Sequence, residues 1–181
     1  MKLSIKELVY VSLFSALTGI GAFIQIPLGP VPITLQTLFV LLSGFLLGPK
    51  LAILSQLTYV LLGLVGLPIF SGMTGGIQSV LKPSFGFIIS FLVASYIVGL
   101  LCKDGKRSMY SYIIAGIIGT SVMYIIGIPY MAFILNVVMK SGLSFIKILE
   151  IGLFLFIPGD IIKLIIASSI GYRLNRIKNY D

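Results

Sequence analysis

Apolar segments of roughly membrane-spanning length recur along the whole chain, and they constrain its fold more than any other feature. About six can be distinguished, at residues 8–26, 34–47, 51–65, 85–101, 110–126 and 158–172, with two short apolar pieces at 129–139 and 144–157. A segment inside a bilayer must satisfy its own backbone hydrogen-bonding groups, which a helix does. The pattern therefore predicts an all-α integral membrane protein of about six transmembrane helices.

Composition supports the same class. The 181 residues are 58% hydrophobic and 10% charged, whereas soluble domains are about 45–50% apolar and about 25% charged. Because the apolar composition extends over the full length, we expect a single transmembrane domain over residues 1–181. The first apolar run continues past Gly21 without a clear small-residue cleavage site, which indicates a retained first helix and not a signal peptide.

Charge placement predicts the orientation of these helices. An even number of spans puts both termini on one side, with the turns at Lys50 and at residues 102–108. That side carries a net charge of +6, from Lys2, Lys6, Glu7, Lys50, Lys103, Asp104, Lys106, Arg107, Arg173, Arg176, Lys178 and Asp181. The other side carries +2, from Lys82, Lys140, Lys147 and Glu150. The positive-inside rule therefore places both termini and residues 103–108 in the cytoplasm, and residues 71–82 outside.

Several functional classes are excluded by what the sequence lacks. Histidine is absent and Cys102 is the single cysteine, so no metal cluster and no nucleophile–base arrangement is predicted, and no enzyme activity. The basic pI follows from the topology, and no aromatic-lined basic surface indicates nucleic-acid binding. The segment "GLLCKDGKRS" departs from a phosphate-binding loop, because Arg107 stands where Ser or Thr is required.

Two ionisable residues interrupt the last apolar span, "FIPGDIIKLIIAS" (156–168). Asp160 lies thirteen residues before Arg173, a helical distance of roughly 20 Å that puts it in the outer half of the membrane. Lys163 lies one turn later on the same face. A structural interpretation is a helix N-cap with a neutralising salt bridge. Burying a lysine costs about 2.5–3.5 kcal/mol on insertion scales, which favours the alternative that both contact a ligand.

Two loops are predicted on the same outer side. Residues 66–86 are too rich in glycine, serine and proline for a lipid-facing helix, and "SGMTGG" (71–76) lets backbone approach a ligand closely. Gln78, Ser79 and Lys82 follow with hydrogen-bonding groups. "PLGPVPITLQ" (27–36) ends at Gln36. Together with Asp160 and Lys163, these segments predict one outward-facing pocket.

At these segments the chain resembles the BioY family, the biotin-specific substrate-binding (S) components of energy-coupling-factor vitamin transporters. The resemblance rests on "PLGPVPITLQTLFVLLSGFLLGPKLA" (27–52), "GLPIFSGMTGGIQSVLKPSFGF" (66–87) and "FIPGDIIKLIIA" (156–167). It implies a six-helix S-component fold with an outward pocket roofed by the loops after the first and third helices. It also implies a membrane-embedded coupling subunit and two ATPase subunits as partners. The chain departs from the family at "LKPSFGF" (81–87), where the family reads closer to "L-x-G-P-T-G-G-Y".

Biotin, the ligand that the resemblance implies, suits the polar residues. An ionised Asp accepts hydrogen bonds and a Lys donates them, so Asp160 suits the ureido N–H groups and Lys163 the carbonyl or a carboxylate oxygen. No cofactor is expected. The remaining candidates are Gln78, Ser79 and Gln36 as neutral hydrogen-bonding partners, Lys82 as a carboxylate partner or a solvated charge, and Phe70 and Phe85 as ring-covering groups or ordinary packing.

The first helix carries small residues at four-residue spacing, which permits close helix–helix approach in lipid. The pairs are Ser12 and Ala16, Ser15 and Gly19, and Thr18 and Ala22. They indicate either packing inside this subunit or, as the resemblance implies, a docking surface for the coupling subunit.

Two other functions remain open from the sequence. One is an S component for another vitamin. The other is a stand-alone secondary transporter with Asp160 as a proton relay, which would predict an internal repeat that the sequence does not show.

Overall fold

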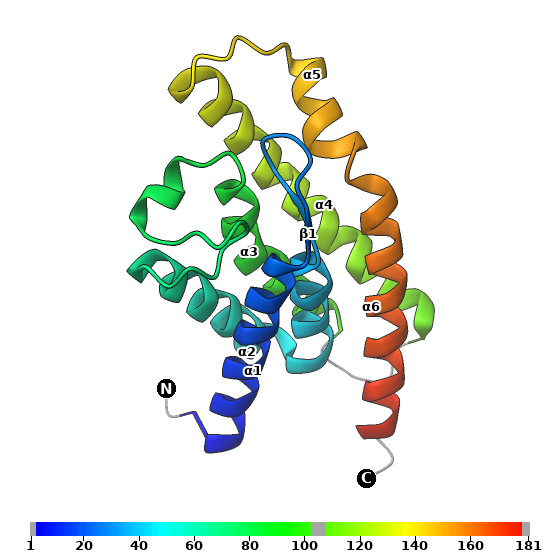
Figure 1. Cartoon of the computed structure of the whole chain (residues 1–181). Helices are drawn as coiled ribbons and strands as arrows, with labels where there is room; N and C mark the ends of the chain where they lie inside the picture. Colours follow the sequence, from blue (N-terminus) through cyan, green and yellow to red (C-terminus); the bar gives the residue numbers. More distant parts are fainter. Residues whose placement is uncertain (1–2, 103–107, 179–181) are drawn as a thin grey trace.

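The computed structural model of the chain describes residues 3–102 and 108–178. The described elements are α1 (Ile5–Phe23), β1 (Gln25–Ile26), β2 (Ile33–Thr34), α2 (Gln36–Val65), a 3₁₀ turn (Ile77–Leu81), α3 (Phe85–Leu101), α4 (Met109–Phe133), a π-helical turn (Ile134–Val138), α5 (Phe145–Leu149), a second π-helical turn (Glu150–Phe154) and α6 (Ile157–Lys178). Figure 1 follows them from α1 in blue to α6 in red. The predicted helical class is confirmed, and the 66–84 segment contains no α-helix.

α1 begins three residues before the predicted first span because polar residues cap it. The Glu7 backbone N–H donates to the Ser4 hydroxyl oxygen at 3.2 Å, and the Ser4 N–H donates to the Glu7 carboxylate at 2.8 Å. This reciprocal capping box satisfies N–H groups that the first turn of a helix leaves unpaired. Hydropathy alone places the start of the helix where the predicted apolar run begins, at residue 8, and does not detect the capping residues before it.

α2 contains the break predicted between its two apolar halves. Gly48 has φ 74° and ψ 174°, a conformation outside the helical region, and Pro49 follows it. Glycine adopts positive φ without steric penalty. α3 passes close to this break: a Cβ added at Gly99 would lie 2.6 Å from the Pro49 nitrogen. Glycine at position 99 therefore lets α3 pack directly against the backbone of the break.

The predicted end of the fifth span at residue 126, before "GIPY" (127–130), is wrong. α4 continues from Met109 through Pro129 to Phe133 and extends into the π-helical turn that ends at Val138. Proline removes one helical N–H donor and tends to kink a helix. In lipid, ending the helix would leave further backbone groups without partners, so a continued helix is the less costly solution. The apolar piece at 129–139 is accordingly the end of α4 together with the π-helical turn that continues it.

The apolar piece at 144–157 is also not a separate element. α5 and the second π-helical turn lead almost directly into α6, and residues 145–177 form one apolar helical segment of 33 residues. Ser144 caps α5 by accepting a hydrogen bond from the Lys147 N–H at 3.3 Å. α6 starts one residue before the predicted Pro158 and runs to Lys178, beyond the predicted end at Tyr172.

The count of six transmembrane helices is not confirmed. Within the described residues, four helical segments are long and apolar enough to cross a membrane: Ile5–Phe23, Gln36–Val65, Met109–Val138 and Phe145–Ile177. α3 is apolar but has 17 residues. The two predicted spans on either side of Gly48 are counted together as α2, although the non-helical conformation of Gly48 divides that element into two helices.

Side chains are distributed as expected for a protein surrounded by lipid. Ile125 is 70% exposed and Ile162 is 59% exposed, whereas Ser43, Ser55 and Gln56 are fully buried. Soluble monomers rarely expose large contiguous apolar surfaces. Together with the four span-length helices, this distribution identifies a multi-pass membrane protein.

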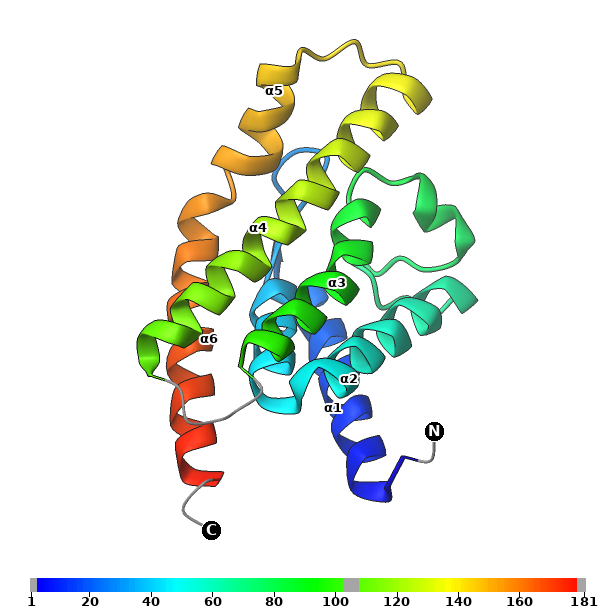
Figure 2. The same cartoon turned by 180° about the vertical axis from the view of Figure 1, so that it is seen from behind.

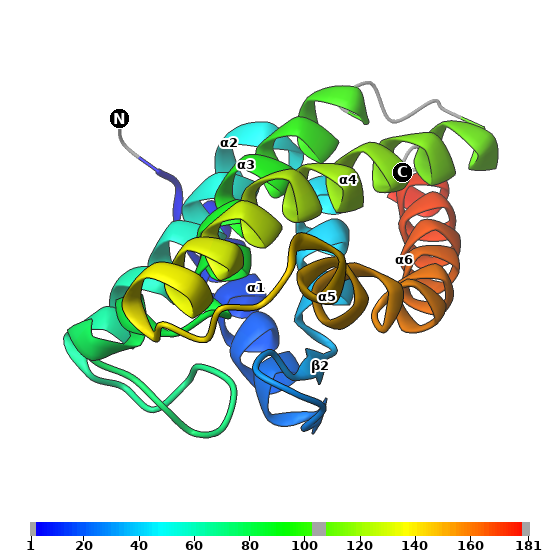
Figure 3. The same ribbon diagram turned by 90° about the horizontal axis from the view of Figure 1, so that it is seen from above.

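The helices place the loops predicted to form the pocket in one half of the molecule. α2 packs against α1 and α3, α3 packs against α4, and α6 packs against α2 and α4. The first turn of α1, the last turn of α6 and the break in α2 lie at one end (Figures 1 and 2). The β1–β2 hairpin, the 66–84 loop and α5 lie toward the other end, and Figure 3 shows the hairpin beside the loop. Lys2, Asp181 and the charged turn at 103–107 lie outside the described residues.

Candidate functional site

A cavity lies between the β1–β2 hairpin, the start of α2, and α3, α4 and α6. Its empty volume is about 530 Å³, a figure that includes the space open to solvent. It is lined by Val31, Pro32, Thr34, Gln36, Thr37, Ser71, Ser84, Phe87, Ile88, Phe91, Thr120, Met123, Tyr124, Phe156, Asp160 and Lys163.

Asp160 and Lys163 supply the charges of this lining. The Lys163 Nζ lies 2.5 Å from the Asp160 Oδ1. Lys163 is only 5% exposed and Asp160 only 8% exposed. They share one face of α6, as their spacing predicts. The neutralising salt bridge of the structural interpretation is therefore present. Asp160 is not the N-cap of α6, because its backbone N–H donates to the Phe156 carbonyl at 2.9 Å, as in the interior of a helix.

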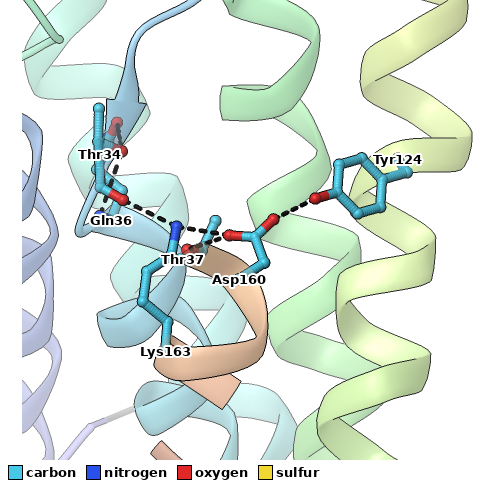
Figure 4. A network of polar contacts seen from close by, with 6 residues as sticks. All are labelled: Thr34, Gln36, Thr37, Tyr124, Asp160 and Lys163. Atoms are coloured by element: carbon cyan, nitrogen blue, oxygen red, sulfur yellow. Dashed lines mark hydrogen bonds and ion pairs between the residues drawn. The ribbon is translucent and has the colours of Figure 1, made fainter. Parts of the chain in front are cut away.

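Three further groups hold the ion pair in place (Figure 4). The Tyr124 hydroxyl donates to Asp160 Oδ2, and the Thr37 hydroxyl donates to Oδ1 at 3.4 Å. Lys163 donates to the Thr34 carbonyl oxygen at 3.0 Å. The pair thus ties α6 to α4, to α2 and to the hairpin after α1. Ion pairs in low dielectric need such additional hydrogen bonds to offset desolvation.

The ion pair retains hydrogen-bonding capacity for a ligand. A carboxylate has about four lone-pair positions and an ammonium group has three donors. Asp160 accepts from three groups and Lys163 donates to two. One acceptor position on Asp160 Oδ2 and one N–H of Lys163 are left, and the pair has no net charge. The site therefore suits a neutral group that carries both an N–H donor and a carbonyl acceptor.

Aromatic rings cover the cavity near the ion pair. Phe87 and Phe156 stack with ring centroids 6.2 Å apart and an interplanar angle of 7°. Phe87 also meets Tyr124 edge to face, with centroids 6.4 Å apart. Ile88, Phe91 and Met123 extend the apolar lining. A largely apolar cavity with a few convergent polar groups is the usual form of a small-molecule site.

Comparisons with known proteins give the family. The sequence model of the BioY family matches residues 1–180. The chain belongs to the BioY family. It is 36% identical over 173 residues to the biotin transporter BioY of Thermotoga maritima, across 96% of this chain and 98% of that protein. It is 41% identical over 169 residues to the probable biotin transporter BioY of Pyrococcus horikoshii, across 93% and 96% of the two chains.

A solved structure agrees with the family assignment. The crystal structure of the S-component for biotin from an ECF-type ABC transporter matches this BioY-family fold with a TM-score of 0.83 and 32% sequence identity. The match covers 95% of this chain and 92% of that one. The family resemblance inferred from the three motifs is thereby confirmed.

Gln36 is the third predicted site residue that lines this cavity, and its side chain is already engaged in hydrogen bonds. Its Nε2 donates to the Tyr59 hydroxyl at 2.7 Å, and its Oε1 accepts from the Thr34 hydroxyl at 3.1 Å. The Tyr59 hydroxyl donates in turn to the Ile69 carbonyl at 3.2 Å. Gln36 therefore connects the cavity to the start of the 66–84 loop, and its contact with a ligand stays a prediction.

The predicted polar residues of the 66–84 loop lie apart from the ion pair. Gln78 is exposed, and its Nε2 donates to the Gly75 carbonyl at 2.7 Å. Ser79 is buried, and its hydroxyl has no hydrogen-bond partner among the described residues. Lys82 lines a neighbouring cavity. None of the three lines the cavity of Asp160 and Lys163, so their roles as ligand contacts stay predictions.

Phe70 and Phe85 are in the hydrophobic core, at 2% and 4% exposure. Their rings meet edge to face with centroids 6.2 Å apart, and Phe70 also packs on Tyr59 at 5.5 Å. Neither ring lines the cavity of the ion pair. This placement favours ordinary packing, which the sequence left open beside a ring-covering role.

Four residues that hold or cover the ion pair were not among the predicted site residues. Phe156 stands one helical turn before Asp160, and Thr37 follows Gln36 directly, so their proximity could have been inferred from spacing. Tyr124 and Phe87 come from other helices, and Tyr124 lies 36 residues before Asp160 in the sequence. The sequence contains no signal that links them, because it does not specify how α3 and α4 rotate toward α6.

The small residues of α1 separate into two groups. Thr18 and Ala22 are buried inside the subunit, where the Thr18 hydroxyl donates to Gln56 at 3.3 Å. The others line an apolar groove on the outside of α1 and the second half of α2. Its members are Ser12, Ser15, Ala16, Gly19, Ile20, Phe23, Thr58, Leu62, Leu67 and Ile69. Ser15 and Gly19 are buried as well, so intramolecular packing accounts for four of the six small residues. Ser12 and Ala16 are exposed in the groove and remain available to a partner.

Proposed function

We propose that this chain is the high-affinity biotin-binding S component of an ECF-type importer. It binds biotin in an outward-facing cavity, with Asp160 and Lys163 as direct contacts. The observation that carries this proposal is the buried, neutral ion pair, which retains one acceptor and one donor beside an aromatic wall. The names of the BioY relatives and of the similar solved structure support biotin as the ligand.

Biotin matches this arrangement in three respects. Its ureido ring presents N–H groups beside a carbonyl and carries no charge, as the ion pair requires. Asp160 accepts from a ureido N–H while Lys163 donates to the carbonyl oxygen. The thiophane ring and the aliphatic tail are apolar and suit the rings of Phe87 and Phe156.

The subunit acts with partners that supply the energy. A membrane-embedded coupling subunit docks in the groove on α1, and two ATPase subunits hydrolyse ATP. The close approach that Ser12 and Ala16 permit supports α1 as the docking helix. We expect the purified chain alone to bind biotin and to show no ATP hydrolysis.

A panel of ligand analogues tests the function. We expect calorimetry on the purified protein to show biotin binding. Dethiobiotin keeps the ureido ring, whereas lipoate keeps only a valerate tail and a sulfur ring. Dethiobiotin should therefore bind better than lipoate. Lipoate should bind at least about a hundredfold more weakly than biotin, since two hydrogen bonds to charged groups contribute about 1.5–3 kcal/mol each. Preferential binding of another vitamin would identify a different S component. Uptake by the chain alone, driven by a proton gradient, would support the secondary transporter.

The orientation can be tested with single cysteines in a Cys102→Ser background. Met73 is 73% exposed in the 66–84 loop, and Ser108 is exposed at the start of α4. An impermeant thiol reagent added to intact cells should label Met73→Cys and leave Ser108→Cys unlabelled until the membrane is opened, because the positive-inside rule puts position 108 in the cytoplasm. Labelling of Ser108→Cys in intact cells would reverse the proposed orientation.

A further inference from the structure

A second cavity adjoins the first, between the hairpin after α1 and the 66–84 loop. The two cavities share Pro32, Ser71 and Ser84 in their linings. The second is lined further by Lys82 and Gln25, and by glycines and prolines of both loops. Because it lies between the loops that cover the ion-pair cavity, it forms a vestibule to that cavity.

Lys82 is the charged residue of this vestibule, and the described part of the chain offers it no acid. Glu7 is engaged in the capping box of α1, Glu150 pairs with Lys147 at 2.6 Å, and Asp160 pairs with Lys163. No hydrogen bond or ion pair of the Lys82 ammonium group is found among residues 3–102 and 108–178. The half-buried Lys82 thus leaves an uncompensated positive charge in the vestibule.

The inner cavity has no such charge. Its one cation, Lys163, is neutralised by Asp160. A carboxylate at the far end of a ligand would therefore find no electrostatic partner beside the ion pair and a favourable one in the vestibule. Gln25 adds a neutral group there: its Oε1 is buried without a hydrogen-bond partner, and rotating the carboxamide would present an N–H instead.

We propose that Lys82 recognises the carboxylate of the ligand from the vestibule. The ligand then spans both cavities, with its ureido ring against Asp160 and Lys163 and its acidic tail directed to Lys82. This inference rests on the proposed function and adds the orientation of the ligand and a preference for anionic ligands. A charge at the mouth of a site acts mainly on the association rate and is screened by salt.

The test compares biotin with biotinamide, in which a neutral amide replaces the carboxylate, on Lys82→Met and Lys82→Arg. We expect Lys82→Met to weaken biotin binding by about three- to tenfold, chiefly through slower association, because a partly exposed charge pair contributes modestly. Biotinamide binding should change by less than about twofold, since it lacks the interacting charge. Lys82→Arg should bind biotin nearly as well as the unsubstituted protein. Added salt should weaken biotin binding in the unsubstituted protein more than in Lys82→Met.

Lys140→Met is the matched control, because Lys140 is an exposed lysine on the same predicted outer side and lines neither cavity. It should leave the binding of both ligands unchanged. Unaltered biotin binding by Lys82→Met, or an equal loss for biotin and biotinamide, would overturn the assignment of Lys82 while leaving the proposed function intact. Failure of the unsubstituted protein to bind biotin would overturn the proposed function and this inference together.

Discussion

Replacing Asp160 by asparagine, or Lys163 by methionine, should weaken biotin binding by about ten- to a hundredfold, because a hydrogen bond to a charged partner contributes about 1.5–3 kcal/mol. Both side chains are buried in the lining of the cavity, where they are largely removed from bulk water. Calorimetric titration of folded protein measures the effect. Each single variant should also lose stability, since it leaves one buried charge unpaired.

The double variant Asp160→Asn/Lys163→Met separates the ligand-contact interpretation from the structural one. If the pair only stabilises the fold, neutralising both residues restores stability and binding together. If both contact the ligand, the double variant regains stability and still binds weakly. Binding by the double variant that equals that of the unsubstituted protein would refute the contact assignment and leave the salt bridge as a purely structural feature.

The chain contains a matched control for this experiment. Lys147 and Glu150 form an ion pair with the same three-residue spacing and a separation of 2.6 Å, but their side chains are 56% and 52% exposed. Exposed pairs contribute little to stability, about 0–1 kcal/mol. Lys147→Met and Glu150→Gln should therefore leave biotin binding unchanged, singly and together. A comparable loss of binding in these variants would show that the effect at Asp160 is indirect.

The sequence predicted features that depend on local chemistry. α3 has the predicted bounds, because a uniformly apolar run lies between a Pro- and Ser-containing loop and a polar turn. The break at Gly48 follows from a glycine–proline pair. The ion pair of Asp160 and Lys163 follows from a three-residue spacing on one helix. The bounds of α3 depend on a contiguous stretch of sequence, and the other two features depend on residues within about one helical turn of one another.

Features that depend on tertiary packing were not predicted. α4 passes through Pro129 because its surroundings, and not its composition, make a break costly. The Tyr124 hydroxyl reaches Asp160 only through the packing of α4 against α6. The loop residue Gln78 has a ligand-binding group but bonds to its own loop. A polar side chain in a glycine-rich segment indicates a capacity to bind, and its direction is set by the folded backbone.

Replacing Ala16 by tryptophan should reduce co-purification with the coupling subunit by about five- to a hundredfold, because overpacking a close helix–helix contact costs about 1–3 kcal/mol. Ala16 is exposed on α1 and lines the apolar groove with Ser12 and Gly19. An added indole would fill the groove that the partner helix needs. Gly19 is a less suitable target, since a Cβ there already meets Ile69 and Tyr59 at 3.8 Å, and a larger side chain would disturb the subunit itself.

Biotin affinity provides the internal reference for this variant, since no residue of α1 lines the cavity of Asp160 and Lys163. Ala16→Trp should therefore bind biotin normally while losing its partner. Ile117→Trp is the matched control, because Ile117 is 49% exposed on α4 and lies outside the groove. Equal losses of co-purification in both variants would point to a general effect of tryptophan on the lipid-facing surface. Normal co-purification of Ala16→Trp would remove this face of α1 from the interface and leave the groove to the lipid.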